Sequence, residues 1–141
     1  MEIKELEQID YESLLEFMER IKNKHEELFP DVTLMSQIAK FNEEYDEMKE
    51  ATKHIDDNPD AFYEELADMF IVACGILRFN TALGNCLCKS IADDFIYKED
   101  DKGNNYLSEL TTKVIEKMNK NIKRVWSKTD NGNYKHVSYL N

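Results

Sequence analysis

The sequence predicts an all-α protein, because a composition that favours helices coincides with apolar residues spaced at a helical period. Of the 141 residues, 42% are hydrophobic and 33% are charged, while only 4 are glycine and 2 are proline. This balance favours a compact helical protein over a sheet protein or a disordered chain. The length fits one hydrophobic core, so we expect a single domain that spans residues 1–141.

The first helix is expected from about Tyr11 to Leu28, with Asp10 as its cap and the Phe29-Pro30 pair at its end. Its apolar residues are Leu14, Leu15, Phe17, Met18 and Ile21. The second helix is expected after Thr33, which is a suitable cap. Its apolar residues alternate steps of four and three, which is typical of a helix-bundle seam. They are Leu34, Ile38, Phe41, Tyr45, Met48, Thr52 and Ile55.

The third helix is expected to begin at Asn58 and Pro59, because asparagine is a good cap and proline suits the first helical position. The connection before it is short, so the second and third helices should be antiparallel neighbours. The third helix carries an apolar stripe of Phe62, Leu66, Met69, Ala73 and Ile76. The Gly84-Asn85 pair is expected to end or kink it, and a fourth short helix should run from about Asn85 to Tyr97.

The fifth helix is expected from about Tyr106 to Trp126, after a polar loop at 98–105. Its core side carries Leu107, Leu110, Val114, Ile115, Met118, Ile122 and Val125. The Asn131-Gly132 pair is a strong turn signal. It predicts a small hairpin between residues 125–127 and 134–138.

The charge of the chain argues against a nucleic-acid polymer as partner and is unevenly distributed along the sequence. The net charge of −11 argues against a nucleic-acid polymer as partner, because such a polyanion must be met by clustered lysines and arginines. The charges are also segregated: residues 43–68 hold 11 acidic and 2 basic side chains, whereas residues 113–128 hold 6 basic and 1 acidic. Such segments can pair in the fold.

The cysteines and the apolar runs indicate a soluble cytoplasmic protein without a membrane partner. Cys74, Cys86 and Cys88 are odd in number and include no C-x-x-C pair, so we expect free thiols. The N-terminal segment has no apolar signal region. The longest apolar run, at 69–77, is too short to span a bilayer.

Two pairs of carboxylates on consecutive helices predict a metal site. Glu44 and Glu47 are three residues apart, as are Glu65 and Asp68, so each pair projects from one helix face. Like charges gathered in this way repel unless a cation neutralises them, and a hard, oxygen-liganded ion such as Mg²⁺, or Mn²⁺ in its place, fits best. The alternative is that these acids form a solvated margin, paired with Lys40, Lys49 or Lys53.

These acids carry a resemblance to a known family. The pattern E-E-x-x-E at Glu43, Glu44 and Glu47 is followed, after 17 intervening residues, by E-x-x-D at Glu65 and Asp68. This arrangement resembles the motif of MazG-type all-α nucleotide pyrophosphohydrolases. The resemblance covers the central helices and extends more loosely into the basic fifth helix, KVIEKMNKNIKRVW.

The resemblance implies a MazG-like four-helix-bundle core with one or two additional helices and a short C-terminal tail or hairpin. It implies a Mg²⁺-dependent hydrolysis of a deoxynucleoside or noncanonical triphosphate to the monophosphate and pyrophosphate, by a metal-activated water, within a homodimer or homotetramer. The metal ligands implied are Glu44, Glu47, Glu65 and Asp68. Glu43, with Glu44 and Glu47, belongs to the implied catalytic set and would orient the water. The implied phosphate contacts are Lys117, Asn121 and Arg124.

Two alternatives remain beside this hypothesis. One is a catalytically inactive helical interaction protein of the same fold. The other is a carboxylate-bridged di-iron bundle, which needs Glu-x-x-His motifs. No histidine of the chain has an acid three positions before it: Lys22, Ala51 and Asn133 precede His25, His54 and His136.

The remaining candidates have ordinary structural interpretations. We expect the histidines at positions 25, 54 and 136 at the surface. Trp126 and Tyr134 could stack on a nucleobase, but a lone tryptophan at a helix end is more often part of the core. Asn42 and Asn80 have only a weak claim to contact a base edge.

Overall fold

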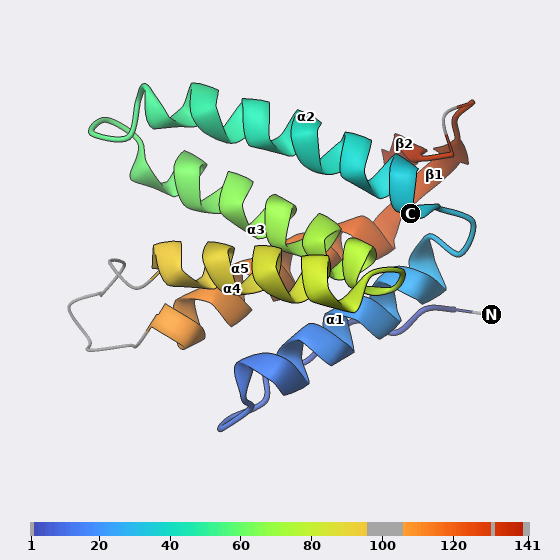
Figure 1. Cartoon of the computed structure of the whole chain (residues 1–141), viewed down its shortest axis with the longest axis horizontal. Coiled ribbons are helices and arrows are strands. Elements are labelled where there is room, and N and C mark those ends of the chain that lie inside the picture. The colour runs from blue at the N-terminus through green and yellow to red at the C-terminus, as the bar shows by residue number, and fades with distance from the viewer. Residues whose placement is uncertain (1, 96–105, 131, 140–141) are drawn as a thin grey trace.

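The computed structural model describes residues 2–95, 106–130 and 132–139. These residues form five helices and one antiparallel pair of strands (Figure 1), so the expected, mostly helical architecture is confirmed. In chain order the elements are α1 (Leu14–Leu28), α2 (Leu34–Thr52), α3 (Pro59–Leu77), α4 (Thr81–Asp94), α5 (Tyr106–Lys123), β1 (Arg124–Lys128) and β2 (Tyr134–Tyr139). Within this part of the chain, no helix combines the length and the apolar character needed to cross a bilayer.

Helix α3 is the centre of the fold. It packs against α1, α2, α4 and α5, and every residue from Met69 to Ile76 is buried. A helix that is apolar on all sides belongs in the interior of a protein. The hydrophobic core is therefore built around the C-terminal half of α3, while its N-terminal half, which carries Glu65 and Asp68, lies at the edge of the core.

The starts of the helices follow their caps. Thr33 and Asn58 cap α2 and α3 as expected, and each side chain accepts a backbone N–H of the first turn. The predicted start of α1 at Tyr11 with Asp10 as cap is wrong. Tyr11 has a φ of 63°, which no right-handed helix contains, and Ser13 caps α1 instead, in a capping box with Glu16.

The predicted break at Gly84-Asn85 is also wrong. Helix α3 ends at Leu77, and Asn80 caps α4, so Gly84 lies inside α4. A Cβ atom at Gly84 would lie 2.5 Å from the Cα atom of Leu77, so the glycine lets α3 and α4 pack in close contact. The buried Sγ atoms of Cys74 and Cys88 are 3.7 Å apart across the same interface, and all three cysteines are free thiols, as expected.

The buried face of α2 differs from the predicted seam. Tyr45 is 44% exposed, and the buried residues of α2 are Ser36, Gln37 and Glu44. Gln37 and Glu44 each precede a residue of the predicted stripe by one position. The buried face of α2 therefore combines Gln37 and Glu44 with Phe41 and Met48 of the predicted stripe, which are partly buried against the core. As a result polar side chains of α2 point inward, and part of the apolar stripe is left exposed.

The end of α5 and the hairpin differ in part from the prediction. Helix α5 ends at Lys123 rather than at Trp126, because Arg124 already begins β1. The strand leaves the carbonyl of Asn121 without its helical partner, and Trp126 Nε1 donates to that oxygen at 2.8 Å. The predicted hairpin is confirmed: β1 pairs with β2, and Gly132 in the turn has a φ of 86°. The predicted loop at 98–105 and the predicted end of the fourth helix at 96–97 lie outside the described residues.

Candidate metal and nucleotide site

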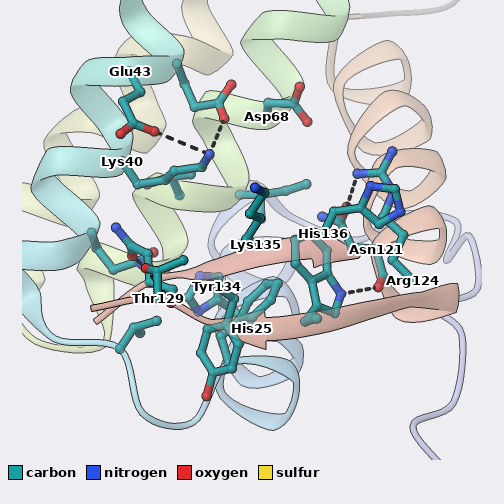
Figure 2. Close-up of a pocket in the computed structure, with 18 residues that line it drawn as sticks. His25, Lys40, Glu43, Asp68, Asn121, Arg124, Thr129, Tyr134, Lys135 and His136 are labelled. Atoms are coloured by element: carbon teal, nitrogen blue, oxygen red, sulfur yellow. Dashed lines mark hydrogen bonds and ion pairs between the residues drawn. The ribbon is translucent and has the colours of Figure 1, made fainter. Parts of the chain in front are cut away.

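A cavity of about 420 Å³ lies where α2, α3, the end of α5 and the hairpin meet (Figure 2). One end is acidic and carries Glu43, Glu44 and Asp68. The other end is lined by aromatic and amide side chains from α1, α2 and the hairpin. Figure 2 shows Glu43 and Asp68 at one side of the cavity, and Tyr134 and His25 at the opposite side.

Three carboxylates meet beside the acidic end of the cavity, and of these three Glu44 lines the cavity. Glu44 and Glu47 from α2 and Glu65 from α3 each offer one oxygen, and these oxygens lie within 4.8 Å of one another. The pairs converge because α2 and α3 are consecutive helices packed side by side, as the sequence predicted (Figure 1). Oε2 of Glu44 and Oε2 of Glu65 are buried without a hydrogen-bond partner among the described residues. Buried polar atoms are normally satisfied, so these two oxygens are suited to a ligand such as a cation.

The raised pKa values of these acids are also consistent with a site that could hold a cation. The pKa of Glu44 is raised to about 7, chiefly because burial disfavours its charged form and also because Asp68 is nearby. The pKa of Glu65 is likewise raised to about 7 by burial, by Asp68 and by Glu47. Burial also raises the pKa of Asp68, and Lys117 opposes that shift. A divalent cation would offset the repulsion between these carboxylates and would thereby favour their ionised forms.

Two lysines flank the carboxylates. Lys40 Nζ lies 3.4 Å from Glu44 and 3.5 Å from Glu43, so the salt-bridge alternative is borne out for this lysine (Figure 2). Lys49 and Lys53 instead pair with Asp46 and Glu50 on the exposed side of α2. The described lysines therefore leave the buried oxygens of Glu44 and Glu65 unsatisfied.

Of the other residues predicted to belong to the site, some line the cavity and others do not. Asp68 lines the cavity but does not belong to the trio, and its Oδ2 lies 3.6 Å from Lys117 Nζ. Glu43 is exposed and lines the cavity beside Lys40. Lys117 is half-buried and is not among the side chains that line the cavity.

The predicted helical face shared by Lys117, Asn121 and Arg124 is only partly present. Arg124 lies in β1, so helical spacing does not place it beside Asn121. The two side chains nevertheless meet, because Arg124 Nη1 donates to Asn121 Oδ1 at 3.3 Å (Figure 2). Both line the cavity, where an arginine and an amide are suited to contact phosphate oxygens.

The aromatic end is formed by side chains from α1, its following loop and the hairpin. Phe29 packs edge-on against Trp126, with 4.9 Å between ring centroids, and against Tyr134 in a tilted arrangement at 5.1 Å. Trp126 also faces His136, at 6.1 Å. Trp126 is half-buried and lines the cavity, so it is both part of the packing and available to a ligand.

A row of buried polar side chains forms the floor of this end, and no sequence pattern pointed to it. His25, expected at the surface, is 2% exposed, whereas His54 and His136 are exposed as expected. Arg78 Nη1 lies 3.0 Å from His25 Nδ1. The pKa of His25 is lowered to about 3, chiefly by burial and also by the charge of Arg78. Because a guanidinium can only donate, Nδ1 of the neutral ring accepts and Nε2 carries the proton.

Gln37 and Asn133 complete this floor. Gln37 Nε2 donates to Asn133 Oδ1 at 3.0 Å, and Asn133 Nδ2 donates to the carbonyl oxygen of Ser36 at 2.9 Å. These bonds join the hairpin to α2. The position of Gln37 and Glu44 one step before the apolar stripe was visible in the sequence, but only the packing of α2 on α3 shows that this side is buried.

The arrangement places a carboxylate cluster that could hold a cation next to a cavity with positive side chains and an aromatic end, and Glu44 belongs to both. Such a set is suited to a ligand that has anionic groups at one end and a planar ring at the other. Comparison of the chain with models of protein families, with curated proteins and with solved structures found no significant match.

Proposed function

We propose that this protein is a MazG-like, Mg²⁺-dependent nucleotide pyrophosphohydrolase that cleaves a deoxynucleoside or noncanonical nucleoside triphosphate to the monophosphate and pyrophosphate. The observation that carries the proposal is the meeting of Glu44, Glu47 and Glu65 beside a cavity whose far end is aromatic, with Glu44 lining that cavity. Two buried oxygens of this cluster have no hydrogen-bond partner among the described residues. The resemblance of the E-E-x-x-E and E-x-x-D pattern to the MazG-type motif supports it.

The carboxylates fit a hard divalent cation. Oxygen ligands from several carboxylates are what Mg²⁺ and Mn²⁺ prefer, and the repulsion within the cluster supplies a reason for binding. Glu44, Glu47 and Glu65 would hold the ion, and Asp68 stands beside them. When bound, Mg²⁺ supplies charge neutralisation of the phosphates and lowers the pKa of a water molecule.

The surrounding side chains would position the substrate. Arg124 and Asn121 can hold phosphate oxygens by directed N–H bonds, and Lys40 can exchange its carboxylate partners for a phosphate. Glu43, exposed at the same end, can accept a proton from the attacking water and orient it. Lys117 would act through Asp68, by holding that carboxylate at the edge of the cluster.

The inactive interaction protein is the alternative that needs a separate test. It would keep the helices but has no use for three converging carboxylates, two of which have pKa values raised to about 7. In a protein that binds no ligand there, repulsion within such a cluster would lower stability without contributing to function.

The test is release of pyrophosphate from a panel of ribonucleoside, deoxyribonucleoside and noncanonical triphosphates, including dUTP, with Mg²⁺ or Mn²⁺. We expect release from at least one triphosphate, and its loss by a factor of at least about 10² in Glu44→Gln, because an essential cation ligand is removed. Asp46→Asn is the matched control, since Asp46 is exposed on the same helix and outside the cluster. If no triphosphate yields pyrophosphate at ample enzyme concentration, the proposal is wrong.

Metal binding provides an independent readout. A ligand that binds only the folded state stabilises it by about 2.7 kcal/mol at a concentration one hundred times its Kd. Mg²⁺ or Mn²⁺ should therefore raise the unfolding midpoint of the wild-type protein and of Asp46→Asn, but not that of Glu44→Gln. Equal midpoints with and without the ion in the wild type would favour the interaction protein.

A further inference from the structure

Lys135 of β2 is a positive side chain that lines the cavity, and no carboxylate of the described residues pairs with it. This distinguishes it from two other cations of the cavity wall. Lys40 Nζ lies 3.4 Å from Glu44, and Arg124 donates to Asn121. An ammonium group that lines a cavity without an acidic partner is suited to an anionic group of a ligand.

Lys135 lies between the two ends of the cavity. Figure 2 shows it between the side that carries Glu43 and Asp68 and the side that carries Tyr134 and His25. In the proposed function the metal ion lies at the carboxylates, and the planar ring of the nucleotide suits the aromatic end. The phosphates connect these two parts of the substrate, so their path leads past Lys135.

Side chains hold the turn end of the hairpin on α2. Among the described residues the two strands contact mainly each other, and a two-stranded hairpin by itself is only marginally stable. Asn133, two residues before Lys135, is buried and attaches this end. It accepts from Gln37 Nε2 at 3.0 Å and donates to the carbonyl oxygen of Ser36 at 2.9 Å. The position of Lys135 therefore depends on these bonds.

The bonds of Asn133 belong to a hydrogen-bonded network with one direction. It begins at the guanidinium of Arg78, which can only donate and whose Nη1 lies 3.0 Å from His25 Nδ1. The Nε2–H of His25 then donates to the side-chain oxygen of Gln37, which leaves the NH₂ of Gln37 to donate to Asn133. The network ends at the carbonyl oxygen of Ser36, which can only accept. Each amide in it therefore has one possible orientation.

The start of this network is fixed by two other parts of the fold. Arg78 Nη1 also donates to the carbonyl oxygen of Phe29 at 2.9 Å. On α3, a Cβ atom at Gly75 would collide with Gln37 Oε1 and would lie 2.7 Å from His25 Nε2, so the glycine gives this pair its room. The network thus holds the turn end of the hairpin in one position relative to α2.

We propose that Lys135 contacts the phosphates of the nucleotide and that Gln37 is a positioning residue, which holds Lys135 at the cavity through Asn133. This inference rests on the proposed function and adds a phosphate contact from the hairpin to those of the basic helix. Gln37 acts on phosphate binding only through the hairpin, so its effect depends on the presence of Lys135.

The first experiment measures by calorimetry the affinity for tripolyphosphate in the presence of Mg²⁺. This probe has phosphates but no base, so its affinity reports the phosphate contacts alone. Lys135→Met should weaken binding by about tenfold, because a charge-assisted contact is lost. Lys128→Met is the matched control, since Lys128 is exposed on the same hairpin and does not line the cavity. It should bind the probe within about twofold of the wild type, because solvent screens a distant charge.

A double-mutant cycle tests the positioning role. Gln37→Met is similar in size but cannot donate to Asn133, and it should weaken probe binding by about fivefold in the wild type and not at all in the Lys135→Met background. Asn133→Ala should give the same pattern. Urea unfolding should show that Gln37→Met lowers stability equally in both backgrounds, since the same bond is lost. Mn²⁺ binding without the probe should be unchanged in every variant, because none of them alters the carboxylates.

The outcomes separate this inference from the proposed function. If the wild type does not bind the probe, or if Lys135→Met binds it as Lys128→Met does, the phosphate contact is wrong. If Gln37→Met and Asn133→Ala weaken binding equally in both backgrounds, or in neither, the positioning role is wrong. Release of pyrophosphate by the wild type leaves the hydrolase proposal standing in each of these cases. If the cycle behaves as expected but no triphosphate yields pyrophosphate, the phosphate contact stands and the hydrolase proposal is wrong.

Discussion

At the residue scale, Glu44 is a position where stability and the proposed function conflict. It belongs both to the carboxylate trio and to the cavity wall, and it is 8% exposed. Its charged form is disfavoured by burial and by the nearby charge of Asp68, and only Lys40 offsets this. Such a residue is retained where a ligand uses it, because strained and charged groups concentrate at functional sites.

The first prediction concerns the stability of the metal-free protein. At pH 8 with a chelator, Glu44→Gln should be more stable than the wild type by on the order of 1–3 kcal/mol, because the neutral amide avoids the cost of a buried charge. Urea unfolding measures the difference, and Asp46→Asn should stay within about 0.5 kcal/mol of the wild type. With saturating Mg²⁺ the order should reverse, since only the wild type gains binding energy. A less stable Glu44→Gln protein without metal would contradict the prediction.

The second prediction concerns His25 and acid. Its pKa is about 3 in the folded protein and 6.5 in an unfolded chain, so below pH 6.5 the unfolded state binds more protons. The contribution of His25 to stability is therefore complete above pH 6.5 and is lost as the pH falls toward 3. Relative to His25→Gln, the wild type should lose about 1.4 kcal/mol per pH unit between pH 6 and pH 4.

Urea unfolding over this pH range, compared between the two proteins, measures that loss. Glu44 and Glu65 act in the opposite direction, because their raised pKa values let the folded state bind more protons between about pH 4.5 and pH 7. Both proteins contain them, so their effect cancels in the difference. His54→Gln, at an exposed position, should show the pH dependence of the wild type. A parallel response of His25→Gln and the wild type would mean that His25 is protonated when folded.

At the element scale, the contact between α3 and α4 depends on one glycine. Replacing Gly84 by alanine places a methyl group 2.5 Å from the Cα atom of Leu77, and backbone cannot move away as a flexible side chain can. We expect Gly84→Ala to lose about 1–3 kcal/mol of unfolding free energy, even though alanine favours a helix by about 1 kcal/mol over glycine. Chemical unfolding measures it, with Cys86→Ala on the exposed side of α4 as control. A stabilised Gly84→Ala protein would refute the close contact.

The elements that the sequence predicts well are those fixed by local chemistry. Thr33, Asn58 and Pro59 mark helix starts through their own side chains, and the Asn131-Gly132 pair marks the hairpin turn. The predicted start of α1 was wrong, because Ser13 and not the nearby Asp10 forms the cap. The predicted end of α3 was wrong, because Gly84 lies inside α4 at its contact with α3. Only the neighbouring helix distinguishes a glycine of that kind from a breaker.

The candidate site also has one part that could be predicted from the sequence and one part that could not. The three carboxylates of the trio could be predicted, because their spacing within two consecutive helices is sufficient to bring them together. The floor of the aromatic end could not be predicted, since Gln37 and Asn133 are separated by 96 residues and meet only when the hairpin packs on α2. The burial of His25 likewise depends on Gly75 of α3 and on Arg78, which follows the end of that helix.

At the scale of the whole molecule, α2 lies at one side of the bundle and packs mainly against α3 (Figure 1). Its buried face includes Gln37 and Glu44, so part of its apolar stripe is left exposed, and Tyr45 is 44% exposed. Ile38 and Tyr45 are seven positions apart, so they lie on the same face. An apolar helix face at the edge of a domain is a common place for a second subunit.

We propose that this face joins the subunits of a homodimer or homotetramer, which is also what the resemblance to the MazG-type enzymes implies. Light scattering coupled to gel filtration should give a mass two or four times the 16.6 kDa of one chain. Tyr45→Glu should lower that mass, because it places a charge in the contact without disturbing the core of the subunit. Leu15→Glu, at a position of α1 that is 60% exposed, tests whether any exposed apolar residue has the same effect, and it should leave the mass unchanged. A wild-type protein with the mass of one chain would rule out the assembly, and because Tyr45 follows Glu44 directly, the same measurement decides whether a partner subunit stands beside the carboxylates.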